Sequence, residues 1–228
     1  MVESESFSFA GRRHGLLPER NEDVVLERDC GTHQVAVLCD GAGGCANGKE
    51  AARFAAEAAA GFLAFRFERC LLDDQTVLRR EMVHLITEVL TKAAQKAGAA
   101  PASFGCTVMA AAMDRQGRWC LFHLGDGAVL GKPYSGSDWL IVSYPQRGLV
   151  PGSTTLTMNG AMFENLRFYR SDHPSLGTLF LASDGMLELL RAVPRLLERP
   201  ELGCALLDME NTLEDDCSAA WLRHASEL

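Results

Sequence analysis

The first 40 residues contain three short segments with the apolar pattern and the β-branched and aromatic residues of β-strands. These segments are SFSFAGR (6–12), DVVLERD (23–29) and HQVAVLCD (33–40). Polar residues and glycines separate them. The chain is therefore predicted to begin with a strand, a loop and two further strands.

Two helical segments follow, from about Gly48 to Cys70 and from about Gln75 to Ala97. Apolar residues recur in both at intervals of three and four, the spacing of one helix face. In the first they are Phe54, Ala58, Phe62 and Phe65, and in the second Leu78, Met82, Leu85, Val89 and Ala93. These stripes predict core packing rather than a cofactor-binding surface.

Strand-like segments return after residue 100. The segments at 104–114 and 118–126 flank the turn DRQG and predict a hairpin. Further strands are predicted at 127–132, 139–144, 165–172, 178–184 and 217–224, with a helical segment at 185–209 that Pro194 and Pro200 interrupt. Turn-forming residues are frequent from Lys132 to Gly160, which predicts a short flap.

The order of these elements favours an α+β fold. Strands, paired helices, many strands, a helix and a strand fit a sandwich of antiparallel sheets better than the alternating order of a parallel nucleotide-binding sheet. The 228 residues are 47% hydrophobic and contain no low-complexity linker or repeat. A single domain over residues 1–228 is therefore expected.

Charge and composition exclude several classes of partner. A net charge of -8 argues against nucleic acid, whose binding proteins usually carry a basic surface. No apolar run reaches the length of a membrane span, and the N-terminus lacks the apolar region of a signal peptide. The eight cysteines include no C-x-x-C pair and are predicted to be reduced core residues. A soluble, cytoplasmic protein is expected.

The glycine-rich stretch VLCDGAGGCANGKEA (37–51) has two incompatible interpretations. Gly43, Gly48 and Lys49 match most of a phosphate-binding loop, but Glu50 replaces its final Ser or Thr. Alternatively, Asp40 holds a metal ion at the end of a buried strand. Glycine-rich turns of this kind often serve backbone geometry alone.

Acidic residues recur at the ends of apolar strands. Asp40, Asp126 and Asp184 each follow an apolar run and precede a glycine. The pair Asp215–Asp216 directly precedes an apolar run. A divalent cation such as Mg²⁺ or Mn²⁺ would offset the cost of burying these carboxylates. Each Asp-Gly pair is also a common turn. The spacing leaves a metal-dependent hydrolase and a nucleotide-binding protein both open.

Taken in order, six motifs resemble the metal-dependent protein phosphatases, the PPM or type 2C serine/threonine family. They are GRRHG with NED, VAVLCDGAGG with NGKEAA, SFGCTV, FHLGDG, LFLASDG and EDDCS. They span nearly the whole chain and are most similar to the compact bacterial members. The resemblance implies a four-layer α-β-β-α sandwich, with two central antiparallel sheets flanked by helix pairs.

The resemblance also implies a site that holds two Mg²⁺ or Mn²⁺ ions. Asp40 would bridge both ions, and Asp40 and Asp184 would act in catalysis through a metal-bound water. Asp215 would complete the first ion's ligands. The Gly41 carbonyl would serve the second ion, with Glu22 and Asp23 acting mainly through water, and Asp126 would help hold a weaker third ion.

The chain departs from the family pattern at groups that bind phosphate or donate protons. Pro18 replaces the arginine that grips the substrate phosphate, so His14, Arg20 and Arg13 become candidates for that role. Ala42 and Cys45 stand where relatives have histidine, and Asp216 replaces an asparagine. His123 lies in an apolar strand and is expected to be a core residue.

The function that the resemblance implies is hydrolysis of phosphoserine and phosphothreonine in proteins, in a signalling pathway that opposes a serine/threonine kinase. The alternative is a regulatory or binding domain that keeps this fold but is catalytically weak or inactive. A nucleotide-binding protein is the third hypothesis.

Overall fold

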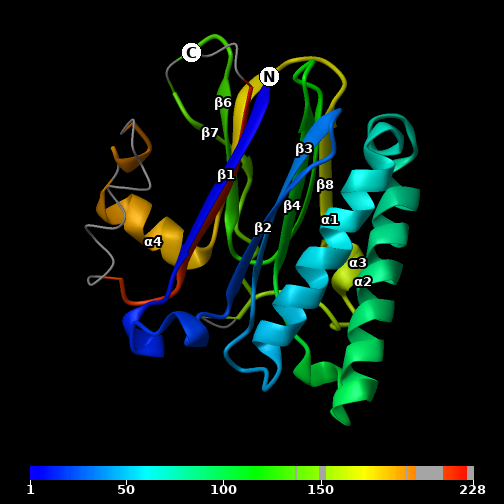
Figure 1. Ribbon diagram of the computed structural model, residues 1–228, viewed down its shortest axis with the longest axis vertical. Helices are drawn as coiled ribbons and strands as arrows, with labels where there is room; N and C mark the ends of the chain where they lie inside the picture. Colours follow the sequence, from blue (N-terminus) through cyan, green and yellow to red (C-terminus); the bar gives the residue numbers. More distant parts are fainter. Residues whose placement is uncertain (137, 149–152, 194, 199–212, 225–228) are drawn as a thin grey trace.

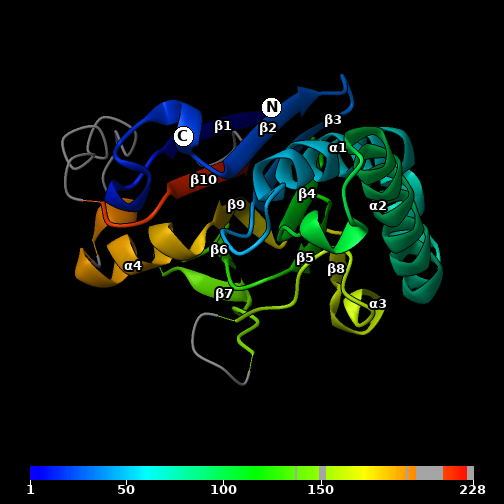
Figure 2. The same ribbon diagram turned by 90° about the horizontal axis from the view of Figure 1, so that it is seen from below.

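The computed structural model describes residues 1–136, 138–148, 153–193, 195–198 and 213–224. Within them the chain forms two five-stranded antiparallel sheets, which lie face to face (Figures 1 and 2). The β1 sheet has the order β1-β10-β9-β6-β7, and the β3 sheet has the order β2-β3-β4-β5-β8.

The strands agree closely with the segments expected from the sequence. Those of the β1 sheet are β1 (Val2–Phe9), β6 (Ala128–Pro133), β7 (Leu140–Ser143), β9 (Leu176–Ala182) and β10 (Cys217–His224). Those of the β3 sheet are β2 (Asp23–Asp29), β3 (His33–Asp40), β4 (Val108–Asp114), β5 (Trp119–Leu124) and β8 (Arg167–Ser171). The predicted hairpin is the β4–β5 pair, in which Met113 lies opposite Trp119.

Helices cover the outer face of each sheet (Figure 2). Two long helices, α1 (Gly48–Leu72) and α2 (Gln75–Ala97), lie on the β3 sheet, and the short α3 (Met162–Asn165) packs beside α2. On the β1 sheet, the described residues form α4 (Asp184–Ala192) and the 3₁₀ turn Leu196–Glu198. The remainder of the helical segment expected up to residue 209 lies outside the described residues. The predicted α+β sandwich is confirmed.

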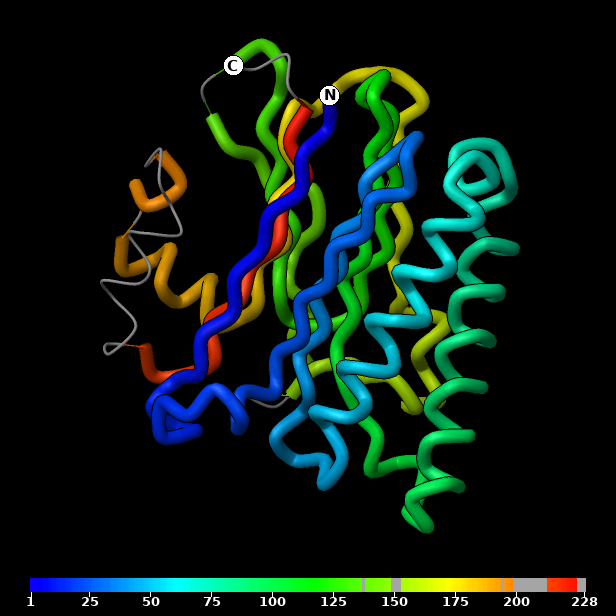
Figure 3. Tube along the Cα trace, in the orientation of Figure 1, coloured from blue at the N-terminus to red at the C-terminus, as the bar shows by residue number. Residues whose placement is uncertain are grey.

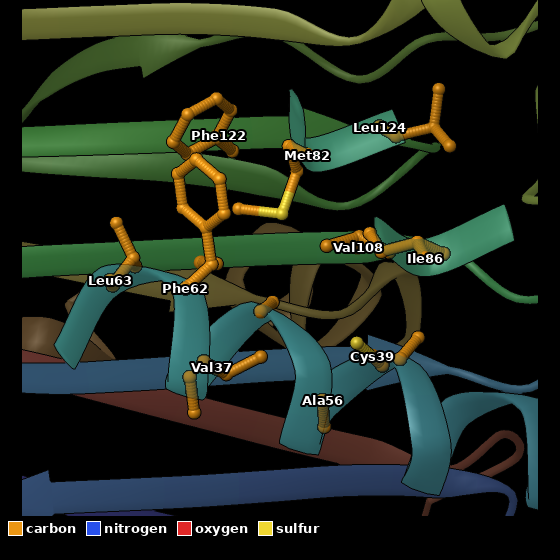
Figure 4. Close-up of a cluster of buried hydrophobic side chains, with 14 of the residues drawn as sticks. Val37, Cys39, Ala56, Phe62, Leu63, Met82, Ile86, Val108, Phe122 and Leu124 are labelled. Atoms are coloured by element: carbon orange, nitrogen blue, oxygen red, sulfur yellow. The ribbon is translucent and has the colours of Figure 1, made fainter. Parts of the chain in front are cut away.

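The alternation of side chains along β3 shows how one strand serves two cores. Val35, Val37 and Cys39 face the helices, whereas Ala36 and Leu38 face the opposite sheet, because successive side chains point to opposite faces. All five are fully buried. Figure 4 shows Val37 and Cys39 in one cluster with Ala56 and Phe62 of α1.

The buried faces of the two helices differ from the expected stripes. In α1 the face on the sheet is mainly alanine, which lets the helix lie close to the strands, and Phe62 packs edge-on against Phe122 with 5.7 Å between ring centres. Phe65, expected in the core, is 87% exposed. In α2 the fully buried row is Leu78, Met82, Ile86, Leu90 and Ala94. Beyond Met82, each buried residue therefore lies one position after the residue expected from the sequence. The reason is that side chains four residues apart lie on one face of a helix, and only one such row faces the core.

The two ends of the described chain form neighbouring strands. β1 and β10 pair antiparallel from Val2 opposite His224 to Phe9 opposite Cys217, and they lie side by side in Figure 3. This pairing brings the loop after β1 against residues 213–216, which precede β10. Backbone bonds from the N–H of Arg12 to Leu213 O (3.0 Å) and from that of Arg13 to Glu214 O (3.1 Å) fix the contact.

Within the segment expected as a flap, Lys132 to Gly160, residues 137 and 149–152 lie outside the described residues, and the others form two structurally distinct parts. Its beginning forms the end of β6 and all of β7, which pair as a hairpin in the β1 sheet. Its later part includes Ser153, Thr154 and Leu156, which line the cavity described below. Whether that part moves over a substrate stays a prediction. No helix of the described residues is long and apolar enough to span a membrane.

Candidate functional site

A cavity of about 560 Å³ brings together the acids that the sequence places at strand ends. It is bounded by both sheets, by the loop after β1 and by the turn between β3 and α1. Six acids from five separate parts of the sequence line it: Glu22, Asp40, Asp126, Asp184 and the adjacent pair Asp215 and Asp216.

Local structure at the ends of two strands positions Asp40 and Asp184. Asp40 is the last residue of β3, and its backbone N–H donates to Thr107 Oγ1 at 3.0 Å. Asp184 begins α4 directly after β9. The N-cap residue Ser183 accepts hydrogen bonds from Met186 N (3.4 Å) and Ser218 N (3.0 Å), which ties the start of α4 to β10. The two sheets thus present acids to the same cavity.

Gly41 and Gly48 allow the turn after β3 to close tightly. A Cβ on Gly41 would lie 2.6 Å from the backbone carbon of Gly48. The Gly41 N–H donates to Glu22 O at 3.1 Å. Lys49 Nζ donates to the backbone carbonyl of Glu19, and residues 48–50 form the first turn of α1. This arrangement gives no support to the phosphate-loop interpretation.

The acids raise one another's pKa values. Burial, followed by the nearby carboxylates of Asp23 and Asp184, holds the pKa of Asp40 well above its usual range. Burial and the charges of Asp126 and Asp215 raise the pKa of Asp184 to about 6. Burial likewise raises the pKa values of Asp126 and Glu22. A bound cation would relieve this repulsion.

Asp23 lies beneath the cavity rather than in its lining. It faces Asp40 across the β2–β3 pair and is 7% exposed, and its Oδ2 has no hydrogen-bond partner. Burial raises the pKa of Asp23 to about 7. An unpaired buried carboxylate oxygen beside Asp40 adds to the need for a compensating positive charge.

The donor set fits a hard divalent cation in its chemistry, because it consists of carboxylate and carbonyl oxygens. In the described part of the chain, however, no three His, Cys, Asp or Glu side chains are grouped as in a formed metal site. Protein groups already engage two of the acids. Arg13 Nη1 donates to Asp215 Oδ2, and His14 Nδ1 lies 2.9 Å from Asp216 Oδ1.

The three candidates for binding substrate phosphate occupy different positions. Arg13 and His14 line the cavity, within the 3₁₀ turn Arg12–His14. Arg20 is exposed in the next 3₁₀ turn, Pro18–Arg20, and does not line the cavity. Of the three, Arg13 and His14 therefore have the placement that the proposed role needs.

Several cavity residues had no role in the sequence-based prediction. Thr107 bonds the backbone of Asp40, and Ser153, Thr154 and Leu156 come from the segment after β7. The charge of Arg147, in the same segment but outside the cavity lining, partly offsets the burial that raises the pKa of Asp126. The turn-rich composition of residues 132–160 was the available signal, but it does not identify which side chains reach the site.

His123 and most of the described cysteines follow the predicted pattern. His123 is fully buried, its Nδ1 lies 2.6 Å from Ser143 Oγ, and burial lowers its pKa to about 3, as expected of a core residue. Seven cysteines are free within the described residues and five of these are buried, while Cys204 lies outside. Cys30 and Cys45 are the two partly exposed cysteines among the described residues, and Cys45 lines the cavity.

Comparison with known proteins identifies the family. The family described as Protein phosphatase 2C matches residues 10–224, and the chain belongs to this family. No curated protein is similar enough in sequence to count as a match.

Solved structures share the fold at low sequence identity. A bacterial serine phosphatase superposes with a TM-score of 0.71 at 18% identity, over 98% of both chains. The serine/threonine phosphatase Stp1 from Staphylococcus aureus gives a TM-score of 0.66 at 18% identity, over 98% of this chain and 95% of that one. PppA, a key regulatory component of T6SS in Pseudomonas aeruginosa, gives 0.67 at 19% identity, over 97% of both chains. At these identities the similarity establishes the fold.

Proposed function

We propose that this chain is a Mg²⁺- or Mn²⁺-dependent phosphatase that hydrolyses phosphoserine and phosphothreonine in proteins. The observation that supports this most strongly is the set of six acids in one cavity, where burial and mutual repulsion raise the pKa values of Asp40 and Asp184. Membership of the Protein phosphatase 2C family supports the reaction class.

In this proposal Asp40, Asp184, Asp215 and the carbonyl of Gly41 hold two ions. Glu22 and Asp23 act on the second ion mainly through water, and Asp126 contributes to a weaker third site. When bound, the ions would supply a water of lowered pKa and neutralise the substrate phosphate. The protein itself holds the carboxylates at fixed strand ends and excludes bulk water from the base of the cavity.

The open cavity suits a phosphorylated side chain on a protein surface. Arg13 and His14 lie on one side of it, and Ser153 and Thr154 contribute hydroxyl groups from the segment after β7. We propose phosphoproteins as substrates, with a serine/threonine kinase as the opposing enzyme, in the cytoplasm. The similar structures named as serine or serine/threonine phosphatases support this substrate class.

The test is phosphate release from p-nitrophenyl phosphate and a phosphothreonine peptide with Mn²⁺. We expect turnover that a chelator abolishes and that Asp40→Asn reduces by at least about 10²-fold, a typical loss when charge stabilisation in an active site is removed. Asp172→Asn is the matched control, because that aspartate is exposed next to His173 and outside the cavity. Chelator-insensitive turnover contradicts the proposal.

One observation favours the alternative of a catalytically weak regulatory domain. Pro18 supplies no guanidinium, and the guanidinium of Arg13, which lines the cavity, is paired with Asp215. If this alternative holds, calorimetry will detect Mn²⁺ binding that Asp40→Asn abolishes, while neither substrate is hydrolysed. Robust turnover of the phosphopeptide excludes it.

A further inference from the structure

Asp216, which replaces an asparagine of the family pattern, contacts His14 in the cavity wall. His14 lies in the turn after β1, and Asp216 lies just before β10, 202 residues further along the chain. His14 Nδ1 is 2.9 Å from Asp216 Oδ1. The pair is partly shielded, since the side chains are 27% and 7% exposed.

Backbone donors hold the Asp216 carboxylate in a fixed orientation. Its Oδ1 accepts the N–H of Gly11 at 2.9 Å, and its Oδ2 accepts the N–H of Glu22 at 2.7 Å. Backbone N–H groups therefore hold both carboxylate oxygens, which fixes the orientation of the Asp216 side chain. Asp216 is built to receive a hydrogen bond from the imidazole rather than to move.

The turn that carries His14 is equally constrained. The N–H groups of Arg12 and Arg13 bond to the carbonyls of Leu213 and Glu214, and a Cβ on Gly11 would overlap the backbone of Asp215. The position of the imidazole is thus fixed at two points, by the hydrogen-bonded backbone of its turn and by the contact of Nδ1 with Asp216. Such two-point fixation is the usual way in which an active-site histidine is oriented.

The other ring nitrogen of His14 is the one available to a substrate. Because Nδ1 is hydrogen-bonded to Asp216, Nε2 is the ring nitrogen that can contact a substrate in the cavity. Among the described residues, none forms a hydrogen bond with Nε2. The hydrogen bond to Asp216 is also the main reason that the pKa of His14 is raised, which favours a proton on both nitrogens. The ring lines the same cavity as the clustered acids.

We propose that His14 is the general acid of the phosphatase reaction and that Asp216 is the residue that positions it. This inference rests on the proposed function. As the phosphorus–oxygen ester bond breaks, its electron pair passes to the serine or threonine oxygen, which takes the Nε2 proton of His14. The attacking water forms the new phosphorus–oxygen bond and releases a proton, and solvent returns one to Nε2.

Cleavage of a phosphoserine or phosphothreonine ester requires a proton donor for the leaving oxygen. An alkoxide is a poor leaving group, and a positioned acid typically contributes about 10²–10⁴-fold to such a step. Ala42, which stands where relatives have histidine, provides no acid. Asp216, where relatives have asparagine, gives the imidazole an anionic partner.

The experiment compares leaving groups. His14→Asn and Asp216→Asn are assayed with Mn²⁺ on a phosphoserine peptide and on p-nitrophenyl phosphate, whose nitrophenolate leaves without a proton. We expect His14→Asn to lower kcat on the peptide by about 10²-fold or more and on p-nitrophenyl phosphate by only a few-fold. Asp216→Asn should also lower kcat more on the peptide than on p-nitrophenyl phosphate, but by a smaller factor. His84→Asn, a surface histidine beside Glu88 on α2, is the control and should change neither rate.

A second measurement tests the positioning without turnover. In ¹⁵N-edited spectra of the metal-free protein, the Nδ1–H proton of His14 should be visible and protected from exchange in the wild type. It should be lost in Asp216→Asn while the rest of the spectrum is unchanged. A visible, protected proton in both proteins contradicts the role of Asp216.

The outcomes separate this inference from the proposed function. Equal losses on both substrates would show that His14 binds phosphate or supports the fold, and unchanged peptide turnover in His14→Asn would show that it has no role; either result overturns the inference alone. A wild type that hydrolyses neither substrate overturns the proposed function and this inference together.

Discussion

At the scale of single residues, the cavity carboxylates oppose folding in the absence of a cation. Asp184 illustrates this, because its pKa is raised to about 6 in the folded chain, against about 3.9 in an unfolded one. The folded state then binds more protons than the unfolded state between these values. Stability contributed by this group therefore falls as pH rises through that window.

Asp184→Asn should remove this pH dependence. In the presence of a chelator, we expect the variant to gain about 1–3 kcal/mol of unfolding free energy relative to wild type between about pH 4 and pH 8. Urea unfolding at the two pH values measures the difference, and comparing the two proteins cancels the contribution of buried histidines such as His123. A difference that stays constant with pH would show that Asp184 is not perturbed.

Two glycines of one turn should respond differently to the same substitution. Gly41→Ala places a Cβ 2.6 Å from the Gly48 backbone, whereas Gly44→Ala meets nothing within 4 Å. We expect Gly41→Ala to cost about 1–3 kcal/mol, as overpacking does, and Gly44→Ala to stay within about 0.5 kcal/mol of wild type. Denaturant titration of both variants checks this, and equal effects would contradict the close approach.

At the scale of elements, local patterns predicted most of the fold. β2, β3 and α2 have the bounds expected from the sequence, because alternation and helical spacing depend on near neighbours only. Phe65 shows the limit of this reasoning. Its spacing from Phe62 suggested one buried face, but the sheet surface is met by the alanines of α1, and that follows from the packing of two elements.

Phe62 and Phe65 form a matched pair on α1. Phe62 is 2% exposed and contacts Phe122, so Phe62→Ala should destabilise the protein by about 3–5 kcal/mol. Phe65→Ala removes an exposed ring and should change stability by less than about 0.5 kcal/mol. Thermal and denaturant unfolding distinguish the two, and a large loss in Phe65→Ala would place that ring in a contact absent from this structure.

At the scale of the whole molecule, the cavity depends on contacts that no local pattern contains. The sequence predicted acids at strand ends, and most of them line one cavity because the sandwich aligns those ends. It did not predict that Arg13 would pair with Asp215, or that His14 would contact Asp216. Both pairs follow from the long-range pairing of β1 with β10, which joins the two ends of the fold.

The proposed ligands come from both sheets, which leads to a prediction about global stability. Asp40 ends a strand of the β3 sheet, while Asp184 and Asp215 adjoin strands of the β1 sheet. A cation held by all three would join the sheets and relieve their mutual repulsion. At Mn²⁺ concentrations about 100 times the dissociation constant, the unfolding free energy should rise by about 2.7 kcal/mol.

Hydrogen exchange can distinguish a cation that joins the two sheets from one that only orders a loop. With Mn²⁺, amide protection should increase in both β3 and β9, since opening either sheet would then release the ion. A chelator should reverse the gain, and Asp40→Asn should abolish it while Asp172→Asn keeps it. If Mn²⁺ protects only one of the two sheets, or protects Asp40→Asn equally well, the proposed ligand set is wrong, because an ion shared between the sheets must stabilise both.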